Sequence, residues 1–210
     1  MFIAVDGIDG SGKSALVRGI AEVLAPWHPL TTREPTDLSY WGRRLRTSAK
    51  EGRLPRATEI EYFHKDRLHH IANVIRPALE RGQIVITDRY VDSTLAFQAD
   101  SAEEADVLYE SYLGTEILCP DITMILCCTV SQGLQRIQRR DTGCLSTFER
   151  DEVQRRAKEI YESRSGTHYR FIDASGTEDE TLRQAIHVLK ENCGERRDIL
   201  DHLEQRLGIT

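Results

Sequence analysis

The chain has 210 residues, of which 40% are hydrophobic and 30% are charged, a composition typical of one globular domain with a sizeable core. The net charge of −6 argues against a protein that coats nucleic acid, so no nucleic-acid partner is expected. No apolar run approaches the roughly 20 residues that cross a bilayer, and no signal-peptide pattern opens the chain, so no membrane association is expected.

The cysteine and histidine patterns argue against a disulfide framework and against a metal site. The cysteines are odd in number, no two have the CxxC spacing, and the adjacent Cys127 and Cys128 would point to opposite faces of a strand. His64, His69 and His70 have helical spacings that do not bring them to one face. The reducing cytoplasm is therefore the expected location. The full set of cysteines is Cys119, Cys127, Cys128, Cys144 and Cys193.

Strands and helices are predicted to alternate along the chain. Apolar runs rich in β-branched residues predict buried strands, and residues such as Leu16, Ile20 and Val23 recur at helical spacing. Strands are expected over residues 2–5, 30–34, 84–88, 122–130 and 169–174, and helices over 13–25, 58–80, both ends of 131–164, 181–189 and 195–207. Two further helical stretches are expected between the third and fourth strands. This alternation predicts a parallel sheet with helices on both faces.

Residues 7–14 read GIDGSGKS and match the phosphate-binding pattern GxxxxGK[ST] at every defined position. In such a loop the backbone N–H groups converge on phosphate oxygens, Lys13 reaches the outer phosphates and the Ser14 hydroxyl suits Mg²⁺. The loop also lies between a predicted strand and the positive end of a helix, where anions bind. The expected nucleotide-binding residues are Gly7, Ile8, Asp9, Gly10, Ser11, Gly12, Lys13 and Ser14.

Other interpretations of this loop explain fewer of its residues. A glycine-rich turn that binds nothing would not need to lie between a strand and a helix. Residues 10–15 also match the dinucleotide pattern GxGxxA, with Glu34 about 20 residues further on, but that interpretation leaves Lys13 and Ser14 without a role. A GTPase is not indicated, because the chain has no guanine-reading NKxD motif.

A second candidate site follows the strand expected over residues 84–88. Asp88 and Arg89 come at its carboxyl end, the edge of the sheet where ligands bind in such folds. Asp88 could hold Mg²⁺ through water, and Arg89 could bind a phosphate through two parallel N–H groups. The alternative is an ion pair at the end of a strand.

Seven motifs occur in the order and spacing of one known family. They read FIAVDGIDGSGKS, TREPT, YFHKDR, DRYVDSTLAFQ, PDIT, FER and FIDAS, and the chain resembles thymidylate kinases from Phe2 to about Leu189. The resemblance implies the α/β fold of P-loop nucleoside monophosphate kinases, with a five-stranded parallel sheet, helices on both faces and a lid. It implies transfer of a phosphoryl group from ATP to dTMP with Mg²⁺, in a homodimer. The kinase domain would cover residues 1–190, with the lid at about 139–150, and residues 191–210 would form a helical extension.

The resemblance also implies roles for individual residues. Asp9 would approach the sugar 3′-hydroxyl, Phe63 would stack on thymine, Arg67 would donate to a base carbonyl and Arg89 would bind the acceptor phosphate. Phe63 and Arg67 are spaced i, i+4 and would share one helix face. The implied acceptor-binding residues are Asp9, Arg33, Pro35, Phe63, Arg67, Arg89, Phe97 and Gln98, and the implied adenine contacts are Ala174 and Ser175. An aromatic wall at Phe97 would disfavour a 2′-hydroxyl.

The lid would supply a further cation. The moving phosphoryl group spreads negative charge over its oxygens, so catalysis is mainly alignment and placement of cations. The phosphate loop has no arginine, and RIQRRD at residues 136–141 offers Arg139 or Arg140. The expected catalytic set is Lys13, Asp9, Arg89, Arg139 and Arg140.

The lid also departs from the family pattern, and this keeps two other functions open. Where the family usually has D-R-[FI]-E, residues 146–149 read STFE, so one arginine is missing. The first is a kinase that acts on another or modified pyrimidine, or on a base hydroxyl in DNA. The second is a nucleotide-binding protein without transfer activity.

Overall fold

The computed structural model describes residues 1–140, 147–194 and 196–208, apart from the side chains of residues 50, 140, 147–150 and 197. Within these residues one five-stranded sheet has the order β2–β3–β1–β4–β5, and every pairing is parallel. The strands are β1 (Phe2–Gly7), β2 (Leu30–Arg33), β3 (Val85–Asp88), β4 (Ile122–Cys127) and β5 (Tyr169–Asp173). The predicted parallel sheet is therefore confirmed.

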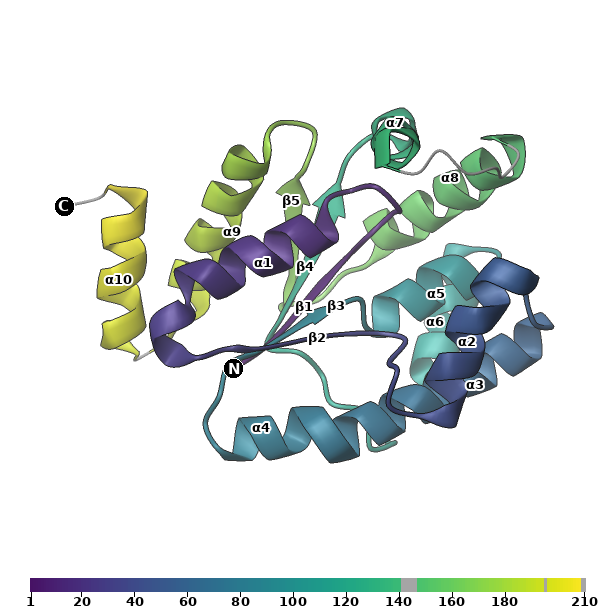
Figure 1. The fold of residues 1–210 in the computed structure, drawn as a ribbon, viewed down its shortest axis with the longest axis horizontal. Coiled ribbons are helices and arrows are strands. Elements are labelled where there is room, and N and C mark those ends of the chain that lie inside the picture. Colours follow the sequence, from purple (N-terminus) through teal and green to yellow (C-terminus); the bar gives the residue numbers. More distant parts are fainter. Residues whose placement is uncertain (141–146, 195, 209–210) are drawn as a thin grey trace.

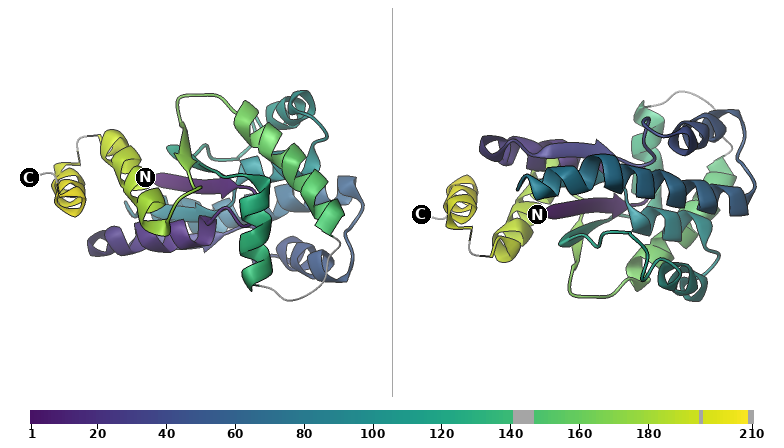
Figure 2. Two further views of the ribbon diagram at one scale, coloured as in Figure 1. Left: turned by 90° about the horizontal axis from the view of Figure 1, so that it is seen from above. Right: turned by 90° about the horizontal axis from the view of Figure 1, so that it is seen from below.

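Helices cover both faces of the sheet (Figures 1 and 2). The α-helices are α1 (Lys13–Val23), α2 (Tyr40–Glu51), α3 (Arg56–His70), α4 (Arg76–Glu80), α5 (Val91–Gln98), α6 (Ala102–Glu110), α7 (Val130–Arg140), α8 (Thr147–Ser163), α9 (Glu178–Asn192) and α10 (Arg197–Leu207). A 3₁₀ turn η1 (Ala25–Trp27) and a π turn η2 (Ile71–Ile75) complete the helical elements. Helices α1 and α9 pack together on one face, and the right-handed β–α–β crossovers place α3, α5 and α8 on the other.

The helix expected over residues 58–80 is a continuous helical run, but a π turn divides it. Pro77 lacks a backbone N–H, and in an α-helix its ring would collide with the carbonyl four residues earlier. The π turn η2 widens the backbone just before this point. It begins directly after His70, the last residue of α3.

Helix α2 was not predicted, because its sequence has few apolar residues at helical spacing. The structure shows why it forms: the Ser39 hydroxyl caps its first turn by accepting from the Gly42 N–H at 2.8 Å. Gly42 also allows close packing on α3, because a Cβ at this position would lie 2.3 Å from the Thr36 carbonyl oxygen and 2.5 Å from the Asp66 carboxylate. The strand expected over 122–130 is also shorter than predicted, because β4 ends at Cys127.

The register of the strands gathers their carboxyl ends at one edge of the sheet. Val5 and Arg33 both pair with Asp88, and Cys127 pairs with Asp173. The loop after β1, the residues after β3 and the loop after β5 therefore meet, as expected for ligand sites in such sheets. No helix of the described residues has the length and hydrophobicity needed to span a membrane. Four of the cysteines, Cys119, Cys127, Cys128 and Cys193, are free thiols, and Cys144 lies outside the described residues.

Candidate active site

The phosphate loop curls around the ammonium group of Lys13. Lys13 is buried, and its Nζ donates to the carbonyl oxygens of Ile8 at 2.7 Å and Gly7 at 3.1 Å. Gly10 has a φ of 75°, and a Cβ there would lie 2.1 Å from the carbonyl oxygen of Gly133 on α7. Only glycine satisfies both the positive φ and this close approach. The loop therefore packs directly against the backbone of α7, and this contact fixes its position.

The charge on Lys13 depends on its surroundings. Burial lowers the pKa of its ammonium group, the nearby Arg89 lowers it further, and Asp9 and Asp88 oppose the shift, leaving a pKa of about 8. Anionic phosphates placed against Nζ would stabilise the charged form and raise this pKa. Proton uptake and nucleotide binding are therefore coupled.

We expect ADP binding to take up a proton at pH 8.5, and its affinity to fall as the pH rises through about 8, because free Lys13 loses its proton there. Isothermal titration calorimetry in two buffers of different ionisation enthalpy measures the uptake. Lys13→Met is the control and should bind ADP, more weakly, without this uptake. Equal uptake in the wild type and in Lys13→Met would contradict the assignment.

A hydroxyl and a carboxylate lie together beside Lys13. Ser14 Oγ donates to Asp88 Oδ2 at 2.5 Å, so the first turn of α1 touches the end of β3. Ser14 is exposed and Asp88 half-buried, so both oxygens can be reached from outside. Oxygen donors of this kind suit Mg²⁺, which keeps several waters and shares substrate phosphates. Among the described residues no group of three or more His, Cys, Asp or Glu could hold a metal by itself.

Arg89 lies opposite the phosphate loop. Its backbone has a φ of 72°, an unfavourable conformation for a residue other than glycine and one often found at functional sites. Its guanidinium group forms an ion pair with Asp9, donates to Ser93 Oγ at 3.0 Å and lies 5.3 Å from the centre of the Phe97 ring. Burial raises the pKa of Asp9, but the Arg89 and Lys13 cations outweigh burial and lower it. Asp9 is therefore an ionised acceptor between two cations.

The other oxygen of Asp9 is held from α8, through a residue that the sequence did not single out. Gln154 is buried, its amide N–H donates to Asp9 Oδ2 at 2.9 Å, and its carbonyl accepts from the Asp9 backbone N–H at 2.9 Å. Gln154 thus fixes both the loop and the orientation of its carboxylate.

On α3, Arg67 and Phe63 lie one turn apart, as predicted, and differ in exposure. Phe63 is half-buried, whereas Arg67 is only 1% exposed. Arg67 Nε and Nη2 both bond Glu34 at 2.9 Å, and Nη2 also donates to the Tyr90 carbonyl at 3.0 Å and to Thr94 Oγ1 at 2.9 Å. Arg67 Nη1 has no hydrogen-bond partner among the described residues. Because a buried unpaired N–H is costly, this nitrogen is expected to gain a hydrogen-bond partner, and a bound ligand is one group that would supply it.

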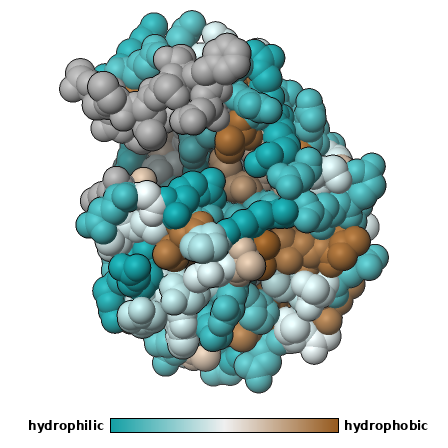
Figure 3. All heavy atoms as spheres, turned by 90° about the vertical axis from the view of Figure 1, so that its right-hand side faces the viewer, coloured by the Kyte–Doolittle hydropathy of each residue, from teal (hydrophilic) through white to brown (hydrophobic). Residues whose placement is uncertain are grey.

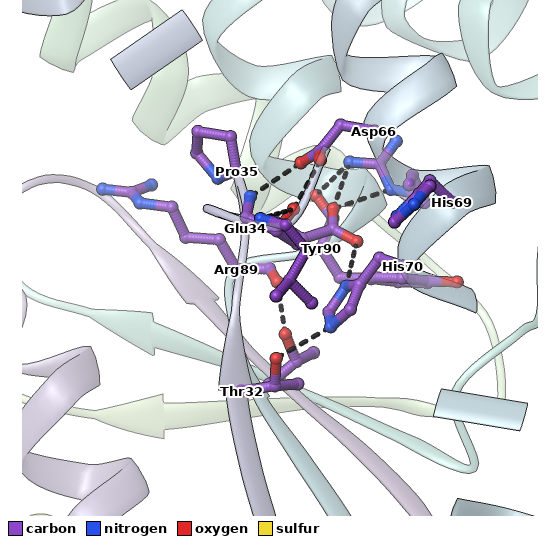
Figure 4. Close-up of polar contacts among 12 residues, drawn as sticks. Thr32, Glu34, Pro35, Asp66, His69, His70, Arg89 and Tyr90 are labelled. Carbon is purple, nitrogen blue, oxygen red and sulfur yellow. Dashed lines mark hydrogen bonds and ion pairs between the residues drawn. The ribbon is translucent and has the colours of Figure 1, made fainter. Parts of the chain in front are cut away.

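The loop between β2 and α2 is fixed by the buried carboxylate of Asp66 (Figure 4). Asp66 accepts from the Thr36 N–H at 2.7 Å, and from the Thr36 and Ser39 hydroxyls at 2.6 Å each. This loop carries Pro35, which the bonds of Asp66 to Thr36 and Ser39 hold in a defined position. Arg33, just before it, is exposed and pairs with Asp37 at 3.4 Å.

Phe97 and Gln98 at the end of α5 face different surroundings. Phe97 is half-buried and contacts Tyr161 edge-on, with ring centres 6.4 Å apart, close to Arg89. Gln98 is buried, and its amide donates to Glu59 at 2.9 Å, so that amide is already used within the protein.

A cavity of about 410 Å³ lies between α1, α7 and the loop after β5. Ser11, Arg18, Arg136, Ala174 and Leu182 are among its lining residues. Ala174 is buried, as part of its wall, and the exposed Ser175 follows it in the chain. The cavity opens next to the phosphate loop and has room for a nucleoside.

Comparison with known proteins shows to which family this chain belongs. The family model described as thymidylate kinase matches residues 5–186. This chain belongs to the thymidylate kinase family. It is 35% identical over 198 residues to the thymidylate kinase of Xanthomonas campestris pv. campestris (strain B100), covering 93% of this chain and 86% of that protein. It is 33% identical over 193 residues to the thymidylate kinase of Xylella fastidiosa (strain 9a5c), covering 91% of each chain.

The resemblance seen in the sequence is thus confirmed, while the individual site residues of this thymidylate kinase family member stay predictions. Sequence reasoning missed Arg136 as a cavity residue; its Nη2 donates to the Gly176 carbonyl at 3.3 Å. Of the two predicted lid arginines, Arg139 is exposed on α7, and the side chain of Arg140 lies outside the described residues, as do residues 141–146. Residues 191–210, predicted as an extension, lie beyond the family match and include α10.

Gln154→Leu is expected to lower kcat/KM for the acceptor about tenfold, because it leaves the buried Asp9 N–H unpaired and frees the Asp9 carboxylate to rotate. Steady-state kinetics with the acceptor varied measures the change. Gln135→Leu, on the exposed face of α7, is the control for the loss of a glutamine amide. Unchanged kcat/KM in Gln154→Leu would show that Asp9 needs no support from α8.

Proposed function

We propose that this chain transfers the γ-phosphoryl group of ATP to dTMP, giving dTDP and ADP. The observation that supports this function most is the presence of two cationic side chains close to one carboxylate. Lys13, inside the phosphate loop, and Arg89, just after β3, are both close enough to Asp9 to lower the pKa of its carboxyl group. One cation suits the donor phosphates and the other suits a second, phosphate-bearing substrate.

ATP would bind with its adenine in the 410 Å³ cavity, near Ala174 and Ser175, and its outer phosphates in the loop over residues 7–14. The backbone N–H groups of the loop and the positive end of α1 would bind the phosphate oxygens. Mg²⁺, held by Ser14 and Asp88 partly through water, would neutralise charge on the same oxygens when bound. Lys13 Nζ would turn from the carbonyls of Gly7 and Ile8 to these phosphates.

The acceptor would bind between α3 and α5, with its phosphate on Arg89. Phe63 would stack on the base, Arg67 Nη1 would donate to a base carbonyl, and Pro35 and Arg33 would line the entrance. Phe97 would lie against the sugar and disfavour a 2′-hydroxyl, while Gln98 would support this wall from behind. Asp9, which Gln154 holds in place, would accept from the sugar 3′-hydroxyl.

The transfer itself needs alignment and charge. An oxygen of the dTMP phosphate attacks the γ-phosphorus in line, the bond to the β-phosphate oxygen breaks, and ADP leaves. Lys13 and Arg89 would hold the two phosphates together, since these otherwise repel one another. Arg139 or Arg140 would add a cation from the lid side during the transition state.

A coupled assay of ADP release tests the function with dTMP, dUMP, dCMP, UMP and AMP as acceptors. Preferred turnover of dTMP is the expected result. Turnover of another acceptor alone would favour a kinase of a different or modified pyrimidine, and ATP binding without turnover would favour a protein that no longer transfers phosphate.

A homodimer and a cytoplasmic location are further parts of this proposal. Exposed apolar side chains that support a subunit contact occur at Leu38, Tyr40, Val107 and Leu113, which are 55–66% exposed. Figure 3 shows apolar surface gathered on the end of the molecule where α2, α3 and α6 lie. Light scattering during gel filtration would give the mass in solution. The cytoplasmic location stays a prediction from the cysteine pattern.

A further inference from the structure

A buried polar chain runs from β2 to Arg67, and its members other than Arg67 have no role in the mechanism described above. Its members are Thr32 on β2, Glu34 in the following loop, and Arg67 and His70 on α3. Figure 4 labels Thr32, Glu34 and His70. Glu34, Arg67 and His70 are 6%, 1% and 0% exposed. Burying polar groups is unfavourable unless they are paired. A chain of paired polar groups buried around Arg67, a candidate acceptor-binding residue, therefore points to a function for the chain.

The Glu34 carboxylate is held on both of its oxygens. Oε2 accepts from Arg67 at 2.9 Å, and Oε1 lies 3.0 Å from His70 Nδ1. With His70 in place, Glu34 has a single orientation and presents one oxygen to the guanidinium group. Without His70, Oε1 would lose its partner, and the carboxylate could rotate about its last bond.

His70 is in turn fixed by Thr32. Its Nε2 lies 2.7 Å from Thr32 Oγ1, and its ring is fully buried. An imidazole with its proton on Nδ1 donates to Glu34 and accepts from the Thr32 hydroxyl, so both ring nitrogens are satisfied. His70 and Arg67 are spaced i, i+3 and lie on the same side of α3. His70 therefore reaches the substrate pocket only through Glu34 and Arg67.

We propose that His70, braced by Thr32, is a positioning residue: it fixes Glu34, and Glu34 in turn holds the guanidinium group of Arg67 in the orientation in which its Nη1 can donate to the acceptor base. The inference rests on the proposed function, because it concerns the base of the acceptor in the same pocket. A 4-carbonyl accepts from Arg67, whereas a 4-amino group is a donor and would leave two donors facing each other. The discrimination requires a guanidinium group that cannot turn away.

The test is the ratio of kcat/KM for dTMP to kcat/KM for 5-methyl-dCMP, which differs from dTMP in its 4-amino group and in the missing N3 proton. We expect His70→Leu to lower this ratio about tenfold, a coupling of the size found between residues in direct contact. His70→Asn, which can still donate to Glu34, should recover part of the ratio, and Thr32→Val should lower it less than His70→Leu. KM for ATP should not change in any of these variants.

Combining His70→Leu with a second substitution, at Arg67, distinguishes a positioning role of His70 from a general effect on stability. In Arg67→Lys, which keeps the charge but loses the planar fork, His70→Leu should change the ratio little further, because the group that it positions is gone. If His70→Leu does not fold, Thr32→Val and His70→Asn carry the test. A wild-type ratio in both of those variants would overturn the inference. A wild-type protein without turnover of dTMP would instead overturn the proposed function, so the two failures are distinguishable.

Discussion

Lys13→Ala is expected to lower kcat by about 10³-fold or more while the protein stays folded, because in the proposed function this ammonium group would be the cation nearest the outer phosphates of the donor. In the free protein Lys13 is buried, and among the described residues its ammonium group bonds two carbonyls of its own loop. Burial lowers the pKa of this group to about 8, so the charged form is not a source of folding stability. The side chain is therefore expected to serve the ligand.

The measurements for this variant are kcat with dTMP and ATP and the midpoint of thermal unfolding. Lys190→Ala is the matched control, because Lys190 lies on α9 and pairs with Glu204 at 2.9 Å, on the side of the molecule where α10 packs (Figure 1). Turnover close to that of the wild type in Lys13→Ala would refute the role of Lys13.

Arg89→Ala is expected to lower kcat/KM for dTMP by about 10³-fold, with a large rise in KM, because the acceptor phosphate would lose its bidentate partner. The variant also removes the ion pair between Arg89 and Asp9, so that Lys13 becomes the nearby cation that stabilises the charge on the Asp9 carboxylate. Arg89→Lys should be intermediate, since it keeps the charge without the fork of two N–H groups.

Initial rates with dTMP varied at saturating ATP, and the reverse, separate the two substrates. Arg81→Ala is the control, because this arginine is exposed after α4 and its side chain donates to Gln83 Oε1 at 3.0 Å, at the surface of the molecule. A rise in KM for ATP with KM for dTMP unchanged would show that Arg89 binds the donor, and would contradict its assignment to the acceptor phosphate.

Contiguous motifs made much of this protein predictable from sequence. The phosphate loop needs its glycines, Lys13 and Ser14 at fixed spacing within eight residues, so the pattern alone indicates the chemistry. The buried parallel strands are runs of apolar and β-branched residues, and their alternation with helices predicted the sheet that the structure shows. Helix α2 escaped prediction because its formation depends on the cap at Ser39 and on packing against α3.

Only the tertiary structure decided how the polar residues are paired. Gln154 meets Asp9 across 145 positions of the sequence, and His70 meets Glu34 across 36. In the sequence, a buried histidine or glutamine looks the same as one in solvent, because local spacing does not record what packs against a helix from elsewhere. Polar groups removed from water must find partners, and the fold determines which ones are within reach.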